Sequence, residues 1–210
     1  MHNKFVINEK GFTGLEAAIV LIAFVVVAAV FSYVMLGAGF FTTQKSQEVV
    51  HTGVSQASSS VELTGNVIAQ GLTATGTATP PLTNISTVDM FMQLTSGGSS
   101  VDIGKTLIVV SAPGIPPTEL KYVAGTTYIG GVPSATQFAI KEAYNDNGNL
   151  IVDKGETFDI QVHLGLVAAA AGTTIGPNKD FTIEVKPPVG TSYTVHRVAP
   201  PTISAIMTLV

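Results

Sequence analysis

The chain has 210 residues, a formal net charge of −4 at neutral pH and no cysteine. Asp, Glu, Lys and Arg make up only 11% of it, well below the usual share of about a quarter. The ten basic residues are scattered, which excludes a nucleic-acid surface. The lack of cysteine excludes a disulfide framework, a thiol nucleophile and a Cys-based zinc site. The length allows one ordinary domain and an appendage.

An uncharged apolar run extends from Ala17 to Phe41 and contains 25 residues. As a helix it would reach about 37 Å, more than the ~30 Å hydrocarbon core of a bilayer. It is also longer than the apolar region of a secretory signal peptide, which has about 7 to 15 residues. Lys4 and Lys10 precede the run and only Lys45 follows it closely, so the positive-inside rule places the N-terminus in the cytoplasm. We therefore predict a precursor that spans the membrane, with the rest of the chain outside.

The helix is predicted to continue beyond the apolar run. Apolar residues recur there at helical spacing among polar ones, namely Val50, Val54, Ala57 and Val61. The pattern predicts one helix over residues 12–64, with a boundary near residue 65 where Gly, Thr and Pro become frequent. The simpler alternative is a bitopic protein with a short stalk between the membrane and an outer domain.

A glutamate stands near the start of the apolar run, in the stretch KGFTGLEAAIVLIAF of residues 10–24. An uncompensated carboxylate costs several kcal/mol in hydrocarbon, so Glu16 indicates more than a membrane anchor. One interpretation is that Glu16 acts in assembly with a partner charge. The other is that it reaches the membrane interface and interacts favourably with the positive end of the helix dipole.

The pattern Lys10-Gly11-Phe12, with Glu16 at the fifth position after the glycine, resembles the class III signal sequence of type IV pilins and archaellins. The resemblance implies that a membrane-bound class III signal peptidase cuts after Gly11, which makes Phe12 the new N-terminus. It also implies that Glu16 pairs with the free amine of Phe12 in a neighbouring subunit. Such a pair would favour the correct register more than it would add raw stability.

The longer stretch GFTGLEAAIVLIAFVVVAAVFSYVMLGAGFFTTQKSQEVVHTGVSQASSS, residues 11–60, resembles the N-terminal domain of an archaellin. By this resemblance, residues 1–11 are the leader, residues 12–64 the filament-core helix and residues 65–210 the outer domain. The implied partners are other copies or sister archaellins, a cytoplasmic motor ATPase and a membrane platform protein.

Short alternating runs follow the boundary. Residues 88–94, 157–164 and 180–185 each place apolar side chains on one face, as half-buried strands do. Further strands are expected at residues 105–112, 119–130, 136–144, 192–198 and 202–210, with Gly-Gly, Pro-Pro and Asn-Gly turns between strands. The predicted class is α+β, with the long apolar helix followed by an antiparallel, loosely immunoglobulin-like β-sandwich.

No motif predicts an enzyme or a required cofactor. The four histidines are scattered, at positions 2, 51, 163 and 196, and no HExxH pair, nucleophile elbow, P-loop or dinucleotide fingerprint is present.

Two smaller sites are predicted in the outer domain. Asn84-Ile85-Ser86 is an N-x-[ST] sequon, for which we expect an N-linked glycan. The other is a set of oxygen-bearing residues at the 1, 3, 5, 9 and 12 offsets of a calcium loop, namely Asn145, Asn147, Asn149, Asp153 and Glu156. The competing and favoured interpretation of that segment is a β-hairpin turn, with Asn147-Gly148 in type I′ geometry.

The sequence thus predicts a secreted subunit that polymerises into an archaellum filament for swimming, with helices in the core and β-sandwiches as the sheath. Two alternatives stay open at this point. One is an archaeal type IV adhesive pilin, and the other is a membrane-anchored extracellular β-domain.

Overall fold

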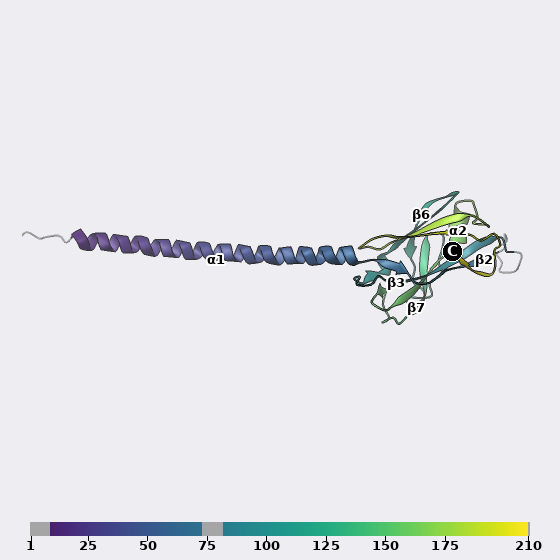
Figure 1. Ribbon diagram of the computed structural model, residues 1–210, viewed down its shortest axis with the longest axis horizontal. Coiled ribbons are helices and arrows are strands. Elements are labelled where there is room, and N and C mark those ends of the chain that lie inside the picture. Colours follow the sequence, from purple (N-terminus) through teal and green to yellow (C-terminus); the bar gives the residue numbers. More distant parts are fainter. Residues whose placement is uncertain (1–8, 73–81, 210) are drawn as a thin grey trace, which may run out of the picture. The chain divides into compact units, whose positions relative to one another are not determined.

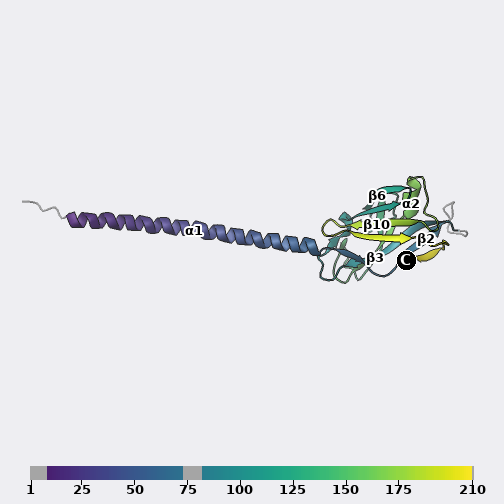
Figure 2. The ribbon, with the colours of Figure 1, turned by 45° about the horizontal axis from the view of Figure 1, so that its top comes forward.

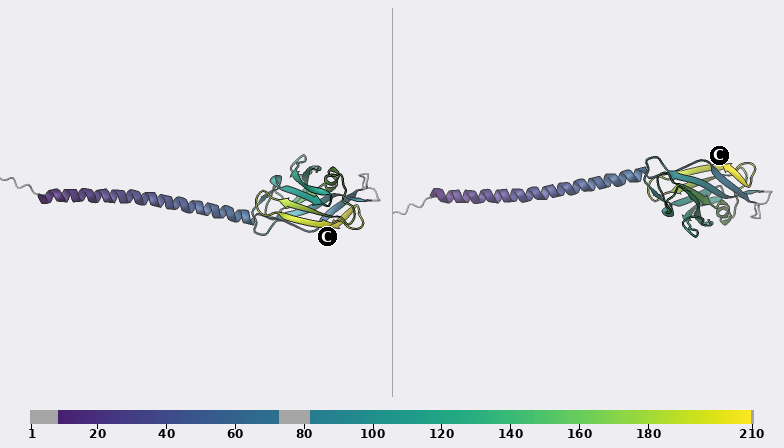
Figure 3. Two further views of the ribbon diagram at one scale, coloured as in Figure 1. Left: turned by 90° about the horizontal axis from the view of Figure 1, so that it is seen from above. Right: turned by 90° about the horizontal axis from the view of Figure 1, so that it is seen from below.

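The computed structural model describes the backbone of residues 9–72 and 82–209, and the side chains of these ranges from residue 14 onward. The first element is α1, a helix of 50 residues over Glu9–Ser58 (Figure 1). It holds no proline, and it curves gently without a sharp kink (Figure 3). The chain divides into two compact units, residues 1–52 and residues 53–210, and we call the second unit the β-domain.

The helix ends earlier than the apolar pattern predicts. Residues 59–64 are not helical, and β1 occupies Val61–Leu63. Consecutive serines precede it, and the hydroxyl of Ser59 donates to the carbonyl of Ser55 at 2.8 Å, a local bond that competes with helix continuation. Val61 is fully buried and belongs to β1, which pairs with β3. The alternation Val-Glu-Leu is compatible with a strand as well as with a helical stripe, so the sequence pattern did not distinguish the two.

The other strands of the described residues are β2 (Val67–Leu72), β3 (Asn84–Leu94), β4 (Val101–Asp102), β5 (Leu107–Ala112), β6 (Ile115–Tyr122), β7 (Gln137–Tyr144), β8 (Ile151–Val152), β9 (Thr157–Val162), β10 (Asp180–Lys186), β11 (Tyr193–Val198) and β12 (Ile206–Leu209). A short 3-10 helix covers Ile103–Lys105, and α2 covers Leu164–Ala170.

The strands form one long sheet that folds over itself. Its order is β11-β10-β5-β6-β7-β9-β3-β2-β12, with β1 also paired to β3, while β4 and β8 pair separately. Among the strands of the described residues, all pairings are antiparallel except β6 with β7, which join in parallel over two residue pairs. This join links the half with β10 to the half with β3, and the two halves form the layers of the sandwich (Figure 2). The predicted α+β class, a long apolar helix followed by a largely antiparallel β-sandwich, is confirmed.

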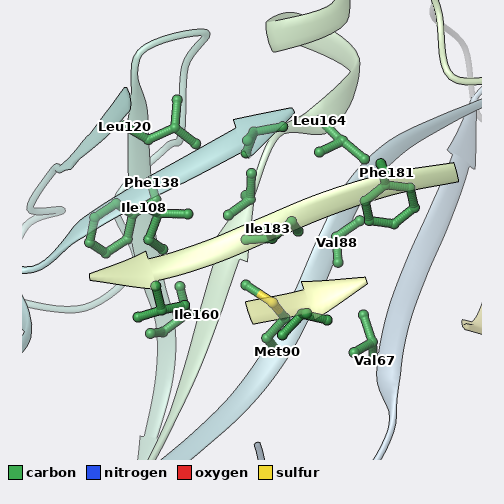
Figure 4. Close-up of a cluster of buried hydrophobic side chains, with 14 of the residues drawn as sticks. Val67, Val88, Met90, Ile108, Leu120, Phe138, Ile160, Leu164, Phe181 and Ile183 are labelled. Carbon is green, nitrogen blue, oxygen red and sulfur yellow. The ribbon is translucent and has the colours of Figure 1, made fainter. Parts of the chain in front are cut away.

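The core lies between the two layers. Phe181 and Ile183 of β10 point toward Val88 and Met90 of β3, and Leu164 of α2 lies at the same core (Figure 4). All five side chains are at most 1% exposed. Alternation explains this packing, because every second residue of these strands faces inward and is apolar.

Each of the eight predicted strand segments contains a strand, but several boundaries differ. The segment expected over residues 119–130 ends as a strand at Tyr122, because the chain then folds back on itself. A Cβ on Gly125 would lie 2.4 Å from the carbonyl oxygen of Ile129, so only glycine permits this close return. Strands β1, β2, β4 and β8 and helix α2 were not predicted.

Candidate assembly surface and polar sites

From Ala17 to Phe41 the surface of α1 is apolar on all sides. Its large hydrophobic side chains are 56–80% exposed within the single chain: Leu15, Ile19, Val20, Leu21, Ile22, Phe24, Val25, Val26, Val27, Val30, Phe31, Tyr33, Val34, Met35, Leu36, Phe40, Phe41, Val49, Val50 and Val54. A helix that is hydrophobic all round belongs in a membrane or in the interior of an assembly. In the described residues, this helix is the one long and apolar enough to cross a membrane.

The predicted assembly residues lie at the start of α1. Lys10, Gly11 and Phe12 are helical, but their side chains are outside the described residues, as are residues 1–8 of the predicted leader 1–11. The side chain of Glu16 is exposed on α1. Phe12 and Glu16 are four residues apart, so they share one helix face. Glu16 is the one charged residue from Gly14 to Phe41.

The last turn of α1 is tied into the β-domain by backbone and hydroxyl contacts. The hydroxyl of Ser55 donates to that of Ser99 at 3.1 Å. The carbonyl of Ser59, just past the helix end, accepts the N–H of Thr191 at 3.2 Å. Gly190 has φ of +102°, and a Cβ there would lie 1.6 Å from the Ser59 carbonyl oxygen. The end of the helix therefore needs a glycine opposite it.

The predicted sequon lies at the first residues of β3 rather than in a loop. Asn84 pairs with Leu72 of β2 and is half-buried, and Ser86 is 6% exposed. Asn84 also lines a cavity of about 210 Å³, mainly apolar, together with Leu72, Ile85, Ser86, His163, Gly165, Leu166, Ala169, Thr174 and Ile175. The asparagine is thus at a strand end beside a small hollow.

The loop of residues 145–156 connects two neighbouring strands. β7 and β9 pair antiparallel, with Tyr144 opposite Thr157, so the expectation of a hairpin is confirmed. The expected type I′ turn is wrong, because the loop is twelve residues long and contains β8. Such a turn needs positive φ at both central residues, whereas Gly148 has it and Asn147 does not.

Three of the five predicted calcium ligands, Asn149, Asp153 and Glu156, accept hydrogen bonds from the protein. The carboxylate of Glu156, 5% exposed, accepts the backbone N–H groups of Asn147 at 3.0 Å and Asp153 at 2.9 Å. The Asn149 side-chain oxygen accepts the N–H of Ile151 at 2.6 Å. Asp153 accepts the Asn147 amide at 3.0 Å and the Ser100 hydroxyl. The described residues hold no cluster of three or more His, Cys, Asp or Glu suited to a metal. The set with three asparagines stays a prediction, and Ca²⁺ would have to compete with these hydrogen bonds for the same oxygens.

A buried polar cluster lies on the outward face of β3, β9 and β7, and sequence reasoning missed it. Asp89 and Asp159 are each 2% exposed. Asp89 accepts from Lys141 Nζ at 2.7 Å and from Gln161 Nε2 at 2.9 Å, and Lys141 lies 3.9 Å from Asp159. The hydrogen bond to Asp89 raises the pKa of Lys141. The signal available in the sequence was an aspartate inside each of two apolar alternating runs.

The capping role of His163, the N-cap of α2, was also not predicted from the sequence. Its Nδ1 accepts the backbone N–H of Leu166 at 3.2 Å. Burial lowers the pKa of His163, so its neutral, accepting form is favoured. The sequence placed His163 on a strand, because the strand pattern before it gave no sign of a following helix.

Comparisons with known proteins agree on one family. Residues 11–197 match the family model for archaeal-type flagellin. The sequence is 46% identical to probable flagellin 1 of Archaeoglobus fulgidus, over 100% of this chain and 99% of that protein. The archaeal flagellum structure of Methanospirillum hungatei strain JF1 has a TM-score of 0.63 at 28% identity, over 94% of this chain and 98% of that one. Archaeal flagellin FlaB1 of Methanocaldococcus jannaschii has a TM-score of 0.59 at 14% identity, over 72% and 96% of the two chains, which is a similarity of fold.

Proposed function

The chain belongs to the archaeal-type flagellin family, and on that premise we propose that α1 forms the core of the archaellum filament while the β-domain forms its outer sheath. The protein is a structural subunit of this extracellular, motile appendage. The observation that carries the division of roles is the all-round apolar exposure of α1.

The energetics of the apolar surface support the core assignment. Burying a large aliphatic or aromatic side chain stabilises by about 1.5 to 3 kcal/mol, so twenty such exposed side chains on α1 exclude a free monomer in water. Lipid covers them before assembly and neighbouring helices cover them afterwards. The β-domain needs no such cover, because its own apolar residues form a closed core. Nothing in this division of labour requires catalysis, and we assign the chain no enzymatic role.

Glu16 is the residue we assign to register during assembly. It is the one charge in the apolar part of α1, and it lies one turn from Phe12 on the same face. After cleavage behind Gly11, the free amine of Phe12 in a neighbouring subunit would neutralise this carboxylate. A helix that slipped out of register would leave both charges unpaired in an apolar bundle, which is costly.

We propose the steps of processing and export on the same premise of family membership. A class III signal peptidase would recognise Lys10 and Gly11 while the precursor spans the cytoplasmic membrane. A motor ATPase and a platform protein would then drive the transfer of α1 from lipid into the growing bundle. We also propose an N-linked glycan at Asn84, a half-buried residue at the first position of β3.

The test is intact mass and N-terminal sequencing of filaments sheared from cells. A sedimentable chain that begins at Phe12 supports processing and polymerisation, and excess mass that Asn84→Gln removes supports the glycan. A chain that begins at Met1 and stays in the membrane would overturn the proposal.

The role of Glu16 has its own variant pair. Glu16→Gln should lower the yield of filaments at least tenfold while the subunit still accumulates in the membrane. Glu48→Gln, in the same helix beyond the apolar run, is the matched control and should assemble normally. Equal filament yields from both variants would remove Glu16 from assembly.

A further inference from the structure

The buried cluster on β3, β9 and β7 faces away from the domain core. Asp89 is the cross-strand partner of Gln161, and Asp159 is the partner of Phe91. Their chain neighbours Met90 and Ile160 point into the core, so the two aspartates point to the opposite face. Even so, each aspartate is 2% exposed. Two carboxylates are therefore removed from water at one place on the outside of the sheet.

The cluster holds one cation for these two acids. Asp89 takes both strong donors, because Lys141 binds one of its oxygens at 2.7 Å and Gln161 the other at 2.9 Å. Asp159 receives only the distant contact with Lys141, at 3.9 Å. Its Oδ1 is buried and has no hydrogen-bond partner among the described residues. A buried ionised carboxylate without donors is costly, so a proton is the simplest means of neutralising it.

We propose that Asp159 is a proton-binding site of the β-domain, occupied under acidic conditions, and that loss of this proton as the pH rises to neutrality weakens the association of β9 with β3 and β7. The inference is independent of how the filament assembles. Burial first, and the neighbouring Asp89 carboxylate second, raise the pKa of Asp159 from 3.8 to about 7. Lys141 opposes this rise without cancelling it.

The surrounding elements add negative rather than positive charge. On β7, Glu142 is the cross-strand partner of Asp159 and accepts a hydrogen bond from Tyr144 at 2.6 Å. On the other side of β3, Glu62 of β1 accepts from Gln93 at 2.8 Å. The β2 residue opposite Asp89 is Ile68. Apart from Lys141, these neighbouring groups thus bring no positive charge to Asp159.

The raised pKa of Asp159 determines how the stability of the β-domain depends on pH. Between about pH 4 and pH 7 the folded β-domain retains a proton that the unfolded chain has lost, so the folding equilibrium constant falls by up to about tenfold per pH unit. Above pH 7 this contribution is constant. His163 titrates with the opposite sign over an overlapping range, so the informative quantity is the difference between the wild type and Asp159→Asn.

The direct test is a carboxyl ¹³C NMR titration of the full chain in detergent micelles with ¹³C-labelled aspartate. We expect one aspartate resonance to titrate near pH 7 and to be missing from Asp159→Asn. Lys141→Met should move that midpoint upward, and Asp89→Asn should move it downward because Lys141 is then free to pair with Asp159. Ionisation of every aspartate by pH 5 would overturn the proposal, as would a midpoint that neither variant moves.

A stability measurement tests the consequence. The ratio of the folding equilibrium constant of Asp159→Asn to that of the wild type should rise at least tenfold between pH 5 and pH 8. Denaturant unfolding of the full chain in micelles measures both constants. Glu119→Gln, an exposed acid on β6, is the matched control and should follow the wild type. If the difference between wild type and Asp159→Asn is the same at both pH values, the site binds no proton that matters for folding.

Discussion

Gly190 is the residue on which the connection between the helix end and the sheet depends most directly. Its backbone has φ of +102°, a region that L side chains rarely adopt, and its Cα lies against the Ser59 carbonyl. That carbonyl accepts the N–H of Thr191, and Ser60 forms a parallel bridge with Thr191. The tight approach sets where the chain leaves α1 and enters β1.

Gly190→Ala should therefore destabilise the β-domain by about 2 to 4 kcal/mol, because strain at positive φ adds to a steric clash with backbone. Denaturant unfolding of the full chain in micelles measures the loss. Gly65→Ala is the matched control, since Gly65 has φ of +82° but open space around it, and it should cost only about 1 to 2 kcal/mol. Equal losses of unfolding free energy at both positions would show that the contact with Ser59 does not contribute to stability.

His163 gives a second residue-scale prediction, on the acid side. Because burial lowers its pKa in the folded state, the unfolded chain binds a proton more readily, and stability falls as the pH drops below about 6.5. Protonation also removes the Nδ1 acceptor that caps α2, at a cost of about 1 kcal/mol after solvent screening. His163→Asn keeps a capping acceptor without titrating, so its stability relative to wild type should rise as unfolding is measured from pH 7.5 down to pH 5. A constant difference would contradict the capping role.

At the scale of elements, the sequence predicted what depends on local pattern. An uninterrupted apolar run predicted α1, and alternation predicted strands such as β9 and β10, because each pattern is contained within a single helix or strand. The Asp89–Lys141 contact joins residues 52 apart and the Asp89–Gln161 contact joins residues 72 apart, so both depend on strand register that no local window contains.

The end of α1 shows the same limit. Val61 fits the helical stripe of Val50 and Val54, yet it is buried in β1 while they are exposed. Only the pairing of β1 with β3 decides between the two interpretations, and that pairing is a long-range contact. The hydrogen bonds of the predicted calcium loop show the same limit, since the sequence offsets gave no sign that the Glu156 carboxylate accepts the backbone N–H groups of Asn147 and Asp153.

The apolar surface of α1 supports a further prediction at this scale. Val26→Asp places a charge in the middle of the run, where burial without a partner costs several kcal/mol per subunit. Sedimentable filaments should be absent, whereas the β-domain should keep its fold, as judged by its unfolding curve in micelles. Gln47→Asp adds the same charge to the polar part of α1 and should assemble. Filaments of normal length from Val26→Asp would refute the core assignment.

At the scale of the whole molecule, the chain contains two units that are stabilised by different means. In the described residues, the buried apolar core begins at Val61 and belongs to the β-domain. The side chains described up to residue 52 are exposed in the single chain and need neighbours to be buried. The stability of α1 is therefore a property of the assembly, and that of the sandwich is a property of the fold.

We accordingly expect filaments to lose structure in two separate thermal transitions. One melts the β-sandwich and the other dissociates the helix bundle, and far-UV circular dichroism should distinguish them by loss of strand or helix signal. Gly190→Ala should lower the temperature of the sandwich transition by several degrees and leave helix dissociation unchanged, because that substitution touches no part of the apolar helix surface. Val26→Leu, which alters packing within the bundle, should shift helix dissociation alone. A single transition that both variants move together would mean that the two units unfold as one cooperative body.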